Sequence, residues 1–154
     1  MKLLIVFLSV MIFASLGAGQ SSTASTRLTP TEIDAIGPIV AGAGTSGLSG
    51  IRTRILTGDP TRAGLYTIQL TIPANTTIQS HTHPDDRVAT VISGTWSIGY
   101  GTVFDEKKLK ELKPGSFYTE PSGEPHFART GKKAVVIQIT GYGPTGTEYT
   151  VKEK

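Results

Sequence analysis

Two of the three histidines in this chain lie two residues apart, in the stretch "SHTH". In a β-strand, side chains at positions i and i+2 project from the same face, so His81 and His83 can reach one metal ion together. Two imidazoles alone make a weak site. The third histidine, His126, follows "PSGEP", where a tight turn is expected to lead into a strand that carries it.

Three imidazoles around one ion would form a facial triad with positions open for water, oxygen or substrate. Imidazole suits Zn, Cu, Fe and Ni alike. The chain has no Cys, which excludes a thiolate metal site and a disulfide framework. It also has no Gly-rich phosphate loop and no nucleophile elbow, so covalent catalysis is not expected.

Other polar residues are candidates for contact with a substrate. Gln79 lies two residues before His81 and is expected to point the same way, where its amide would orient a bound water or substrate; the alternative is a surface Gln. Tyr118 shares a strand face with Glu120 if "GSFYTE" is regular, and would line the cavity near His126. Core filling is the alternative for Tyr118.

The elements that must position these residues are short strands. From Ile51 the apolar residues recur with period two, as in "AGLYTIQLTI", and further runs are "VATVIS", "TWSIGYG", "GSFYTE", "HFAR", "AVVIQIT" and "EYTV". Gly and Pro separate them, which predicts an antiparallel sandwich or barrel without a long helix. Before them, Thr29 with Pro30 and Glu32 predicts one helical turn, and the Gly-rich "AGAGTSGLSG" is expected to wrap the barrel surface.

Two longer motifs now carry a family resemblance. The pattern G-x5-P-x-G-x2-H-x3-N is matched in spacing by Gly115, Pro121, Gly123 and His126, with Thr130 in place of the Asn. The pattern G-x5-H-x-H-x3,4-E-x6-G is matched by Asn75, His81, His83, Arg87 and Gly94, where Asn replaces the first Gly and Arg replaces the Glu. With these motifs, residues 51–150 resemble the cupin superfamily, and in particular small secreted or periplasmic single-domain cupins.

The resemblance implies an all-β fold, the antiparallel double-stranded β-helix or jelly-roll barrel. It also implies a mononuclear centre of His81, His83 and His126 that holds a divalent transition metal ion, whether Fe, Mn, Ni, Zn or Cu. Three-histidine cupins include dioxygenases, and other cupins are isomerases or lyases. Because cupins often pair through strand edges, a homodimer is a further expectation.

Arg87 is the departure that matters most. Its guanidinium stays protonated in proteins. If it pointed at a divalent ion from about 5 Å, the repulsion at an effective dielectric of 20 would be about 6 to 7 kcal/mol. Either Arg87 turns toward Asp85, Asp86 or another carboxylate, or an anion lies between it and the metal. In the second case Arg87 would clamp an anionic substrate. Asp86 as a substitute ligand would need an irregular turn.

These residues predict a small-molecule metalloenzyme in which Arg87, Tyr118 and Gln79 position a substrate, which is anionic if Arg87 clamps it. The alternative is a non-catalytic ligand-binding or sensing barrel that has lost the usual Glu. A third possibility is a structural barrel whose histidines bond each other or the backbone and bind no metal.

The N-terminus has the order of a secretory signal peptide: Lys2, then an apolar run to about Leu16, then small residues. We therefore expect a signal peptide at residues 1–19, a spacer and wrapping segment at 20–50 and the barrel domain at 51–154, with a secreted or periplasmic location. The apolar run is shorter than the roughly 20 residues of a spanning helix. An uncleaved anchor is the weaker alternative, and no stable membrane insertion is expected after cleavage.

The charge of the chain gives no support to a nucleic-acid partner. Lys and Arg outnumber Asp and Glu by 15 to 12, and removal of residues 1–19 takes away only Lys2, which leaves the mature chain nearly neutral. The run "KKLKELK" interleaves a Glu and two Leu residues, and we interpret it as a solvated amphipathic edge. The expected partner is a small molecule.

Overall fold

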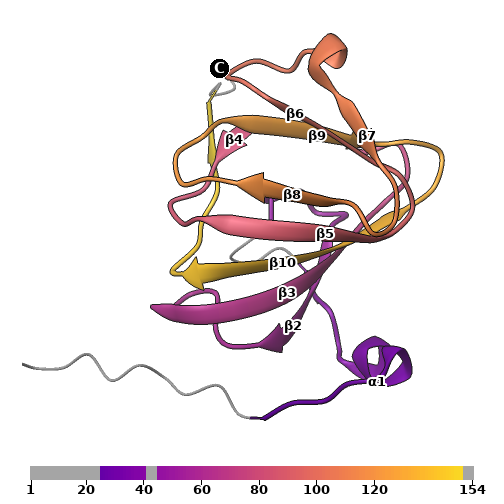
Figure 1. Ribbon diagram of the computed structural model, residues 1–154, viewed down its shortest axis with the longest axis vertical. Helices are drawn as coiled ribbons and strands as arrows, with labels where there is room; N and C mark the ends of the chain where they lie inside the picture. Colours follow the sequence, from indigo (N-terminus) through magenta and orange to yellow (C-terminus); the bar gives the residue numbers. More distant parts are fainter. Residues whose placement is uncertain (1–24, 41–44, 151–154) are drawn as a thin grey trace, which may run out of the picture.

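The computed structural model describes residues 25–40 and 45–150, so the predicted signal peptide lies outside the described residues. Two antiparallel β-sheets face each other and enclose the core (Figure 1). The strand order is β1-β2-β3-β10-β5-β8 in the six-stranded sheet and β11-β4-β9-β6-β7 in the five-stranded sheet. This confirms the predicted all-β, antiparallel double-sheet architecture.

The strands follow the predicted runs closely. The six-stranded sheet contains β1 (Ile39–Val40), β2 (Arg52–Thr57), β3 (Gly64–Ile72), β5 (Arg87–Ser93), β8 (Phe117–Glu120) and β10 (Val135–Gly143). The five-stranded sheet contains β4 (Thr77–Thr82), β6 (Trp96–Tyr100), β7 (Lys110–Leu112), β9 (His126–Thr130) and β11 (Glu148–Tyr149). Three of them add to the quoted runs: β1 comes from the expected spacer, β2 pairs with β1, and β7 turns part of "KKLKELK" into an edge strand of the sheet.

Helix is confined to short segments in the described ranges. The α-helix α1 (Pro30–Ala35) begins at the expected cap, where the Thr29 side chain accepts from the Glu32 backbone N–H and the Glu32 carboxylate accepts from the Thr29 backbone N–H. A 3-10 turn, η1 (Glu106–Lys108), precedes β7. Neither is long and apolar enough to span a bilayer.

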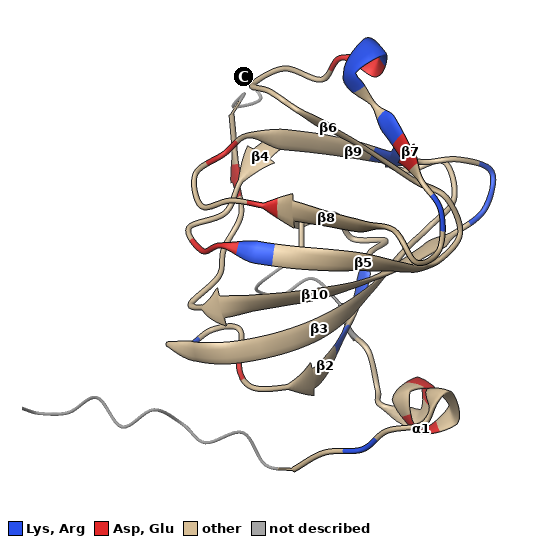
Figure 2. Cartoon of the chain, in the orientation of Figure 1, with Lys and Arg blue, Asp and Glu red and all other residues tan. Residues whose placement is uncertain are grey.

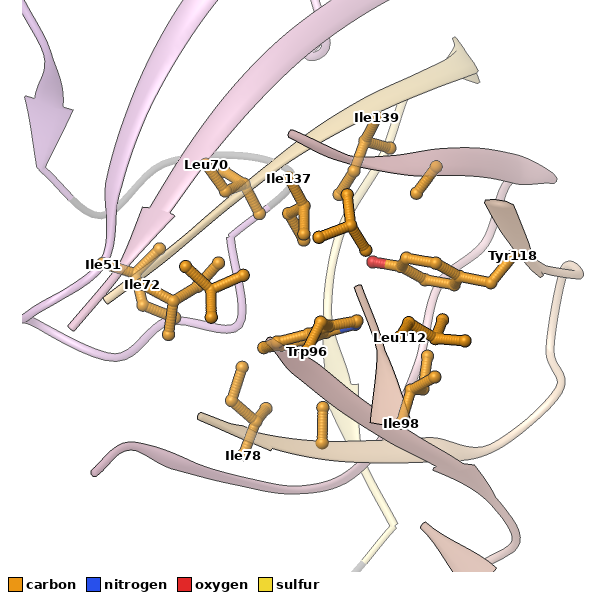
Figure 3. Packing of buried hydrophobic residues seen from close by; sticks show 14 of the residues in the cluster. Ile51, Leu70, Ile72, Ile78, Trp96, Ile98, Leu112, Tyr118, Ile137 and Ile139 are labelled. Atoms are coloured by element: carbon orange, nitrogen blue, oxygen red, sulfur yellow. The ribbon is translucent and has the colours of Figure 1, made fainter. Parts of the chain in front are cut away.

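The core forms where the apolar faces of the two sheets meet (Figure 3). Along β3, the side chains of Tyr66, Ile68, Leu70 and Ile72 are buried, as the period of two predicts. Strand β10 pairs with β3 and has the same alternation. From the opposite sheet, Trp96 packs into the same cluster.

Two strand pairs carry the residues that the motifs single out. Strand β4 pairs with β9, and the register has an irregularity between Ile78 and His81. On the other sheet β5 pairs with β8, so that Arg87 lies opposite Glu120. In Figure 2 the blue start of β5 lies beside the red end of β8, while the broad strands β3 and β10 carry neither colour. Asn75 has φ 54°, a left-handed turn conformation that Asn tolerates in place of the Gly of the motif.

Candidate metal centre

The three histidines come together in the interior between the sheets. One ring nitrogen of each lies within 4.8 Å of those of the other two. His81 on β4 is the register partner of His126 on β9, and His83 follows the last residue of β4. All three side chains are buried. The predicted same-face pair and the histidine of the second motif therefore form one cluster.

Each imidazole is oriented by a backbone carbonyl. The Nδ1 atoms of His81, His83 and His126 lie 2.8 Å, 2.5 Å and 3.1 Å from the carbonyl oxygens of Gln79, Gly146 and Glu124. A carbonyl oxygen only accepts, so each Nδ1 carries the proton and donates it. In a neutral ring this leaves the Nε2 atom with a lone pair, which is the arrangement that metal-binding histidines adopt.

The donor set fits a divalent transition metal. Within the described part of the chain, Nε2 of His83 and Nε2 of His126 are buried and have no hydrogen-bond partner. Burial lowers the pKa of His81 to about 4 and that of His83 to about 3, so both rings are neutral at pH 7. A buried acceptor without a donor is unfavourable, and a cation held by these lone pairs would remove that cost.

Arg87 is buried, and its positive charge is paired with the carboxylate of Glu120. Its Nε donates to Glu120 Oε2 at 2.7 Å, and its Nη2 donates to the same oxygen. Burial alone would lower the pKa of Arg87 and raise that of Glu120; the attraction between them outweighs it, raising the first and lowering the second to about 2. The pair is ionised and mutually neutralised, which is the condition for burying two charges.

Glu120 also faces the imidazoles. Its Oε1 lies 3.7 Å from His126 Nε2, and its Oε2 lies 3.9 Å from His83 Nε2. The carboxylate therefore lies between the Arg87 guanidinium and the histidine nitrogens. Of the two options for Arg87, the structure shows the first: Arg87 binds another carboxylate, Glu120, and does not point into the site as a free clamp for a substrate anion.

A carboxylate does face the histidines, but it comes from a different strand than the motif would give. The motif would place it at position 87 on β5, and this chain has it at position 120 on the neighbouring β8, directly across the register. Sequence reasoning placed Glu120 on the face of Tyr118 but did not connect it with Arg87. The missing information was the pairing of β5 with β8.

The prediction that the Gln79 side chain points the same way as His81 is wrong. Gln79 is exposed, whereas Ile78, Ser80 and His81 are buried. The register irregularity between Ile78 and His81 shifts the alternation by one residue, so Gln79 faces away from the site. Only its backbone carbonyl takes part, as the acceptor for His81 Nδ1.

Tyr118 is buried on the same face of β8 as Glu120, as predicted. It lies in the hydrophobic cluster, with its hydroxyl pointing toward the middle of that cluster in Figure 3. Burial raises the pKa of Tyr118 well above its usual value, so the hydroxyl keeps its proton. Tyr118 packs in the core behind Glu120, and it is not among the residues that line the cavity at the histidines.

The two aspartates after His83 have structural partners. The Asp85 carboxylate is buried and accepts from the Tyr66 hydroxyl at 2.7 Å. Asp86 Oδ1 accepts from the Ser122 backbone N–H at 2.9 Å and so holds the turn that precedes β9. Among the residues that the structure describes, the group that can hold a metal consists of the three histidines, without Asp86.

A small cavity adjoins the cluster. About 20 Å³ of it is open to the centres of water molecules, which is room for a water or two. Its polar lining consists of the three histidines, Arg87, Glu120 and Ser46. Its apolar lining is mostly aliphatic and includes Ile51, Leu70, Ile72, Ile78, Ile137 and Ile139. A compact ligand with a polar end and an aliphatic body suits such a lining.

No family model matches the sequence, and no curated protein matches it. Solved structures do match. An RmlC-like cupin from Shewanella frigidimarina superposes with a TM-score of 0.55 at 13% identity, over 78% of this chain and 92% of that one. The chain has the cupin fold. This is the double-stranded β-helix that the two motifs implied.

Other structures with the same fold have known activities. The polyketide cyclase RemF from Streptomyces resistomycificus has a TM-score of 0.64 at 17% identity, over 85% of this chain and 89% of that one. The DMSP lyase DddQ from Ruegeria pomeroyi has a TM-score of 0.58 at 18% identity; the match covers 78% of this chain and 64% of that one. At such identities the likeness establishes the fold and not the reaction.

Proposed function

We propose that this cupin is a metal-dependent enzyme that acts on a small molecule, with His81, His83 and His126 as protein ligands and Glu120 as the acidic partner of the metal. One observation carries the proposal. Three imidazoles, each fixed by a backbone carbonyl at Nδ1, bring one ring nitrogen apiece within 4.8 Å of one another beside a small cavity, and the Glu120 carboxylate lies 3.7 Å and 3.9 Å from two of the rings.

The metal ion, Arg87 and Glu120 would have different roles in the cavity. When bound, a divalent metal ion would supply Lewis-acid polarisation or oxygen activation. Arg87 holds the Glu120 carboxylate in place. With a pKa near 2, Glu120 is a weak proton acceptor, so its role is that of a negative charge or fourth ligand beside the metal rather than of a general base.

The cavity also limits the substrate. Since Arg87 and Glu120 neutralise each other, a divalent ion would leave the site with a net positive charge, which favours an anionic or carbonyl oxygen. The remaining walls are mostly aliphatic, which favours a compact apolar body. The fold neighbours include a cyclase and a lyase, so non-redox chemistry on a small carbon compound has precedent on this fold.

Elemental analysis tests the proposal most directly. The protein is purified from its native host, because overexpression can load the wrong ion. It is expected to contain about one transition metal ion per chain. Oxygen consumption with small acids and carbonyl compounds then separates a dioxygenase from an isomerase or lyase, which uses no oxygen. Native protein without stoichiometric metal would rule out the proposed enzyme.

A second candidate is a ligand-binding or sensing barrel without catalysis. The observation in its favour is the small size of the cavity, about 20 Å³ for water centres, which leaves little room for a substrate to react. It predicts that the metal-loaded protein binds a small acid reversibly and returns it unchanged. Recovery of the ligand after prolonged incubation, followed by nuclear magnetic resonance, distinguishes the two functions.

We also propose that the protein works after export, as the charged, apolar and small residues of 1–19 indicate. Intact-mass measurement on protein recovered outside the cytoplasm is expected to show loss of about this segment. A full-length cytoplasmic product would contradict export without affecting the proposed metal centre.

A further inference from the structure

A serine from outside the two cupin motifs faces the histidine cavity. Ser46 lines the cavity together with His81, His83 and His126. Ser46 is 5% exposed, and its hydroxyl oxygen has no hydrogen-bond partner within residues 25–40 and 45–150. A buried hydroxyl without a partner costs free energy, and such groups commonly bind a water or a ligand.

The position of Ser46 is fixed by the C-terminal end of the barrel. The Tyr149 hydroxyl donates to the Ser46 carbonyl at 2.5 Å, and the Thr147 hydroxyl donates to the Thr45 carbonyl at 2.6 Å. These bonds hold the backbone of Ser46. The backbone contacts therefore fix the place of the Ser46 side chain at the cavity.

The residues that hold Ser46 also contact the histidines. Tyr149 on β11 is the register partner of His81, and the two rings are 5.6 Å apart between centroids. The carbonyl of Gly146, just before Thr147, is the acceptor for His83 Nδ1. One short segment, Gly146–Tyr149, thus orients a proposed metal ligand and the serine together, so the two keep a fixed relation.

We infer that Ser46 is a ligand-positioning residue of the metal centre, and that it donates a hydrogen bond to an oxygen of a compact carboxylate whose other oxygen lies at the metal. The inference rests on the proposed function. Ser46 supplies a neutral donor to the ligand, while Arg87 is bound to Glu120. The aliphatic lining receives the body of the ligand.

Cobalt-loaded protein titrated with acetate tests this inference, with the visible absorption of the bound Co²⁺ as the readout. Ser46→Ala is expected to bind Co²⁺ as wild type does and to bind acetate about tenfold more weakly, because one hydrogen bond to a charged group is lost. Tyr149→Phe, which releases the Ser46 carbonyl, is expected to weaken acetate binding less. Ser93→Ala and Tyr142→Phe, both at exposed residues, are the matched controls and are expected to behave as wild type.

The outcomes separate the inference from the proposed function. If wild type binds Co²⁺ and Ser46→Ala binds acetate as tightly as wild type does, the inference is wrong and the metal centre stands. If Ser46→Ala loses Co²⁺, Ser46 is a metal ligand and not a ligand-positioning residue. If wild type binds no Co²⁺, the proposed function fails and the inference fails with it. Thermal unfolding of each variant shows that the fold is retained.

Discussion

The two sheets contribute different chemistry to the same cavity. The five-stranded sheet brings three imidazoles from β4, β9 and the residue after β4, each of which is held by a backbone carbonyl. The six-stranded sheet brings a cation and an anion from β5 and β8, which are each other's register partners. Neutral bases tolerate burial singly, whereas buried charges must be paired. The difference explains why an Arg at the position of the motif acid is accompanied by an acid on the neighbouring strand.

The largest effect is expected on the histidine side. His81→Ala combined with His83→Ala removes two of the three imidazoles, and one imidazole does not hold a divalent ion. We expect complete loss of bound metal, measured by elemental analysis after dialysis, with a β-rich circular dichroism spectrum close to that of wild type. Equal metal content in variant and wild type would contradict the three-histidine assignment.

On the charged side, breaking the pair is expected to destabilise the metal-free fold. Arg87→Met leaves the buried Glu120 carboxylate without its partner, which is expected to lower the unfolding free energy by about 3–5 kcal/mol. Urea titration measures this change. The matched variant is Arg87→Met with Glu120→Leu, which removes both charges and is expected to lie within about 1 kcal/mol of wild type or above it. Equal stability of the single and double variants would show that the two charges do not depend on each other.

Moving the acid between the two strands tests which of the two positions interacts with the metal. Arg87→Glu alone is expected to tighten metal binding, because it removes a positive charge and adds a carboxylate beside the histidines. The exchange Arg87→Glu with Glu120→Arg restores the acid to the position of the motif, and its metal affinity is expected to be similar to that of wild type. Calorimetric titration measures both. Unchanged affinity in Arg87→Glu means that position 87 does not sense the metal.

The imidazoles also predict a pH dependence for the metal-free protein. Burial holds the pKa of His81 near 4 and that of His83 near 3, below the value of about 6.5 for an unfolded chain. The unfolded state therefore binds protons first, and stability is expected to fall as the pH drops from about 6.5 toward 4. The variant with Ala at positions 81 and 83 is expected to show a flatter profile in urea titrations over this range.

The smallest effect is expected at Gln79. Its side chain is exposed, and its contact with the site is the backbone carbonyl that accepts from His81 Nδ1, which any residue at this position supplies. Gln79→Ala is expected to change unfolding free energy by no more than about 0.5 kcal/mol and to leave metal affinity unchanged. Weaker metal binding in this variant would mean that the side chain, and not the carbonyl, acts on His81.

What the sequence determined by itself is local. The alternation in "AGLYTIQLTI" predicted a half-buried strand, and the structure has it as β3. The spacing of His81 and His83 and the turn before His126 identified the three imidazoles. The capping box at Thr29 and the left-handed turn at Asn75 are local as well. Each of these depends on a few neighbouring residues, so a pattern in the sequence can report it.

The features that could not be read from the sequence depend on strand pairing. Glu120 forms an ion pair with Arg87, 33 positions away in the sequence, because β5 and β8 align these two residues. The register irregularity in β4 turned Gln79 outward, although strict alternation predicted it inward. Ser46 reaches the cavity because a segment about a hundred residues later, at Thr147 and Tyr149, holds its backbone there. Register and bulges are set by contacts between distant segments, and no local period encodes them.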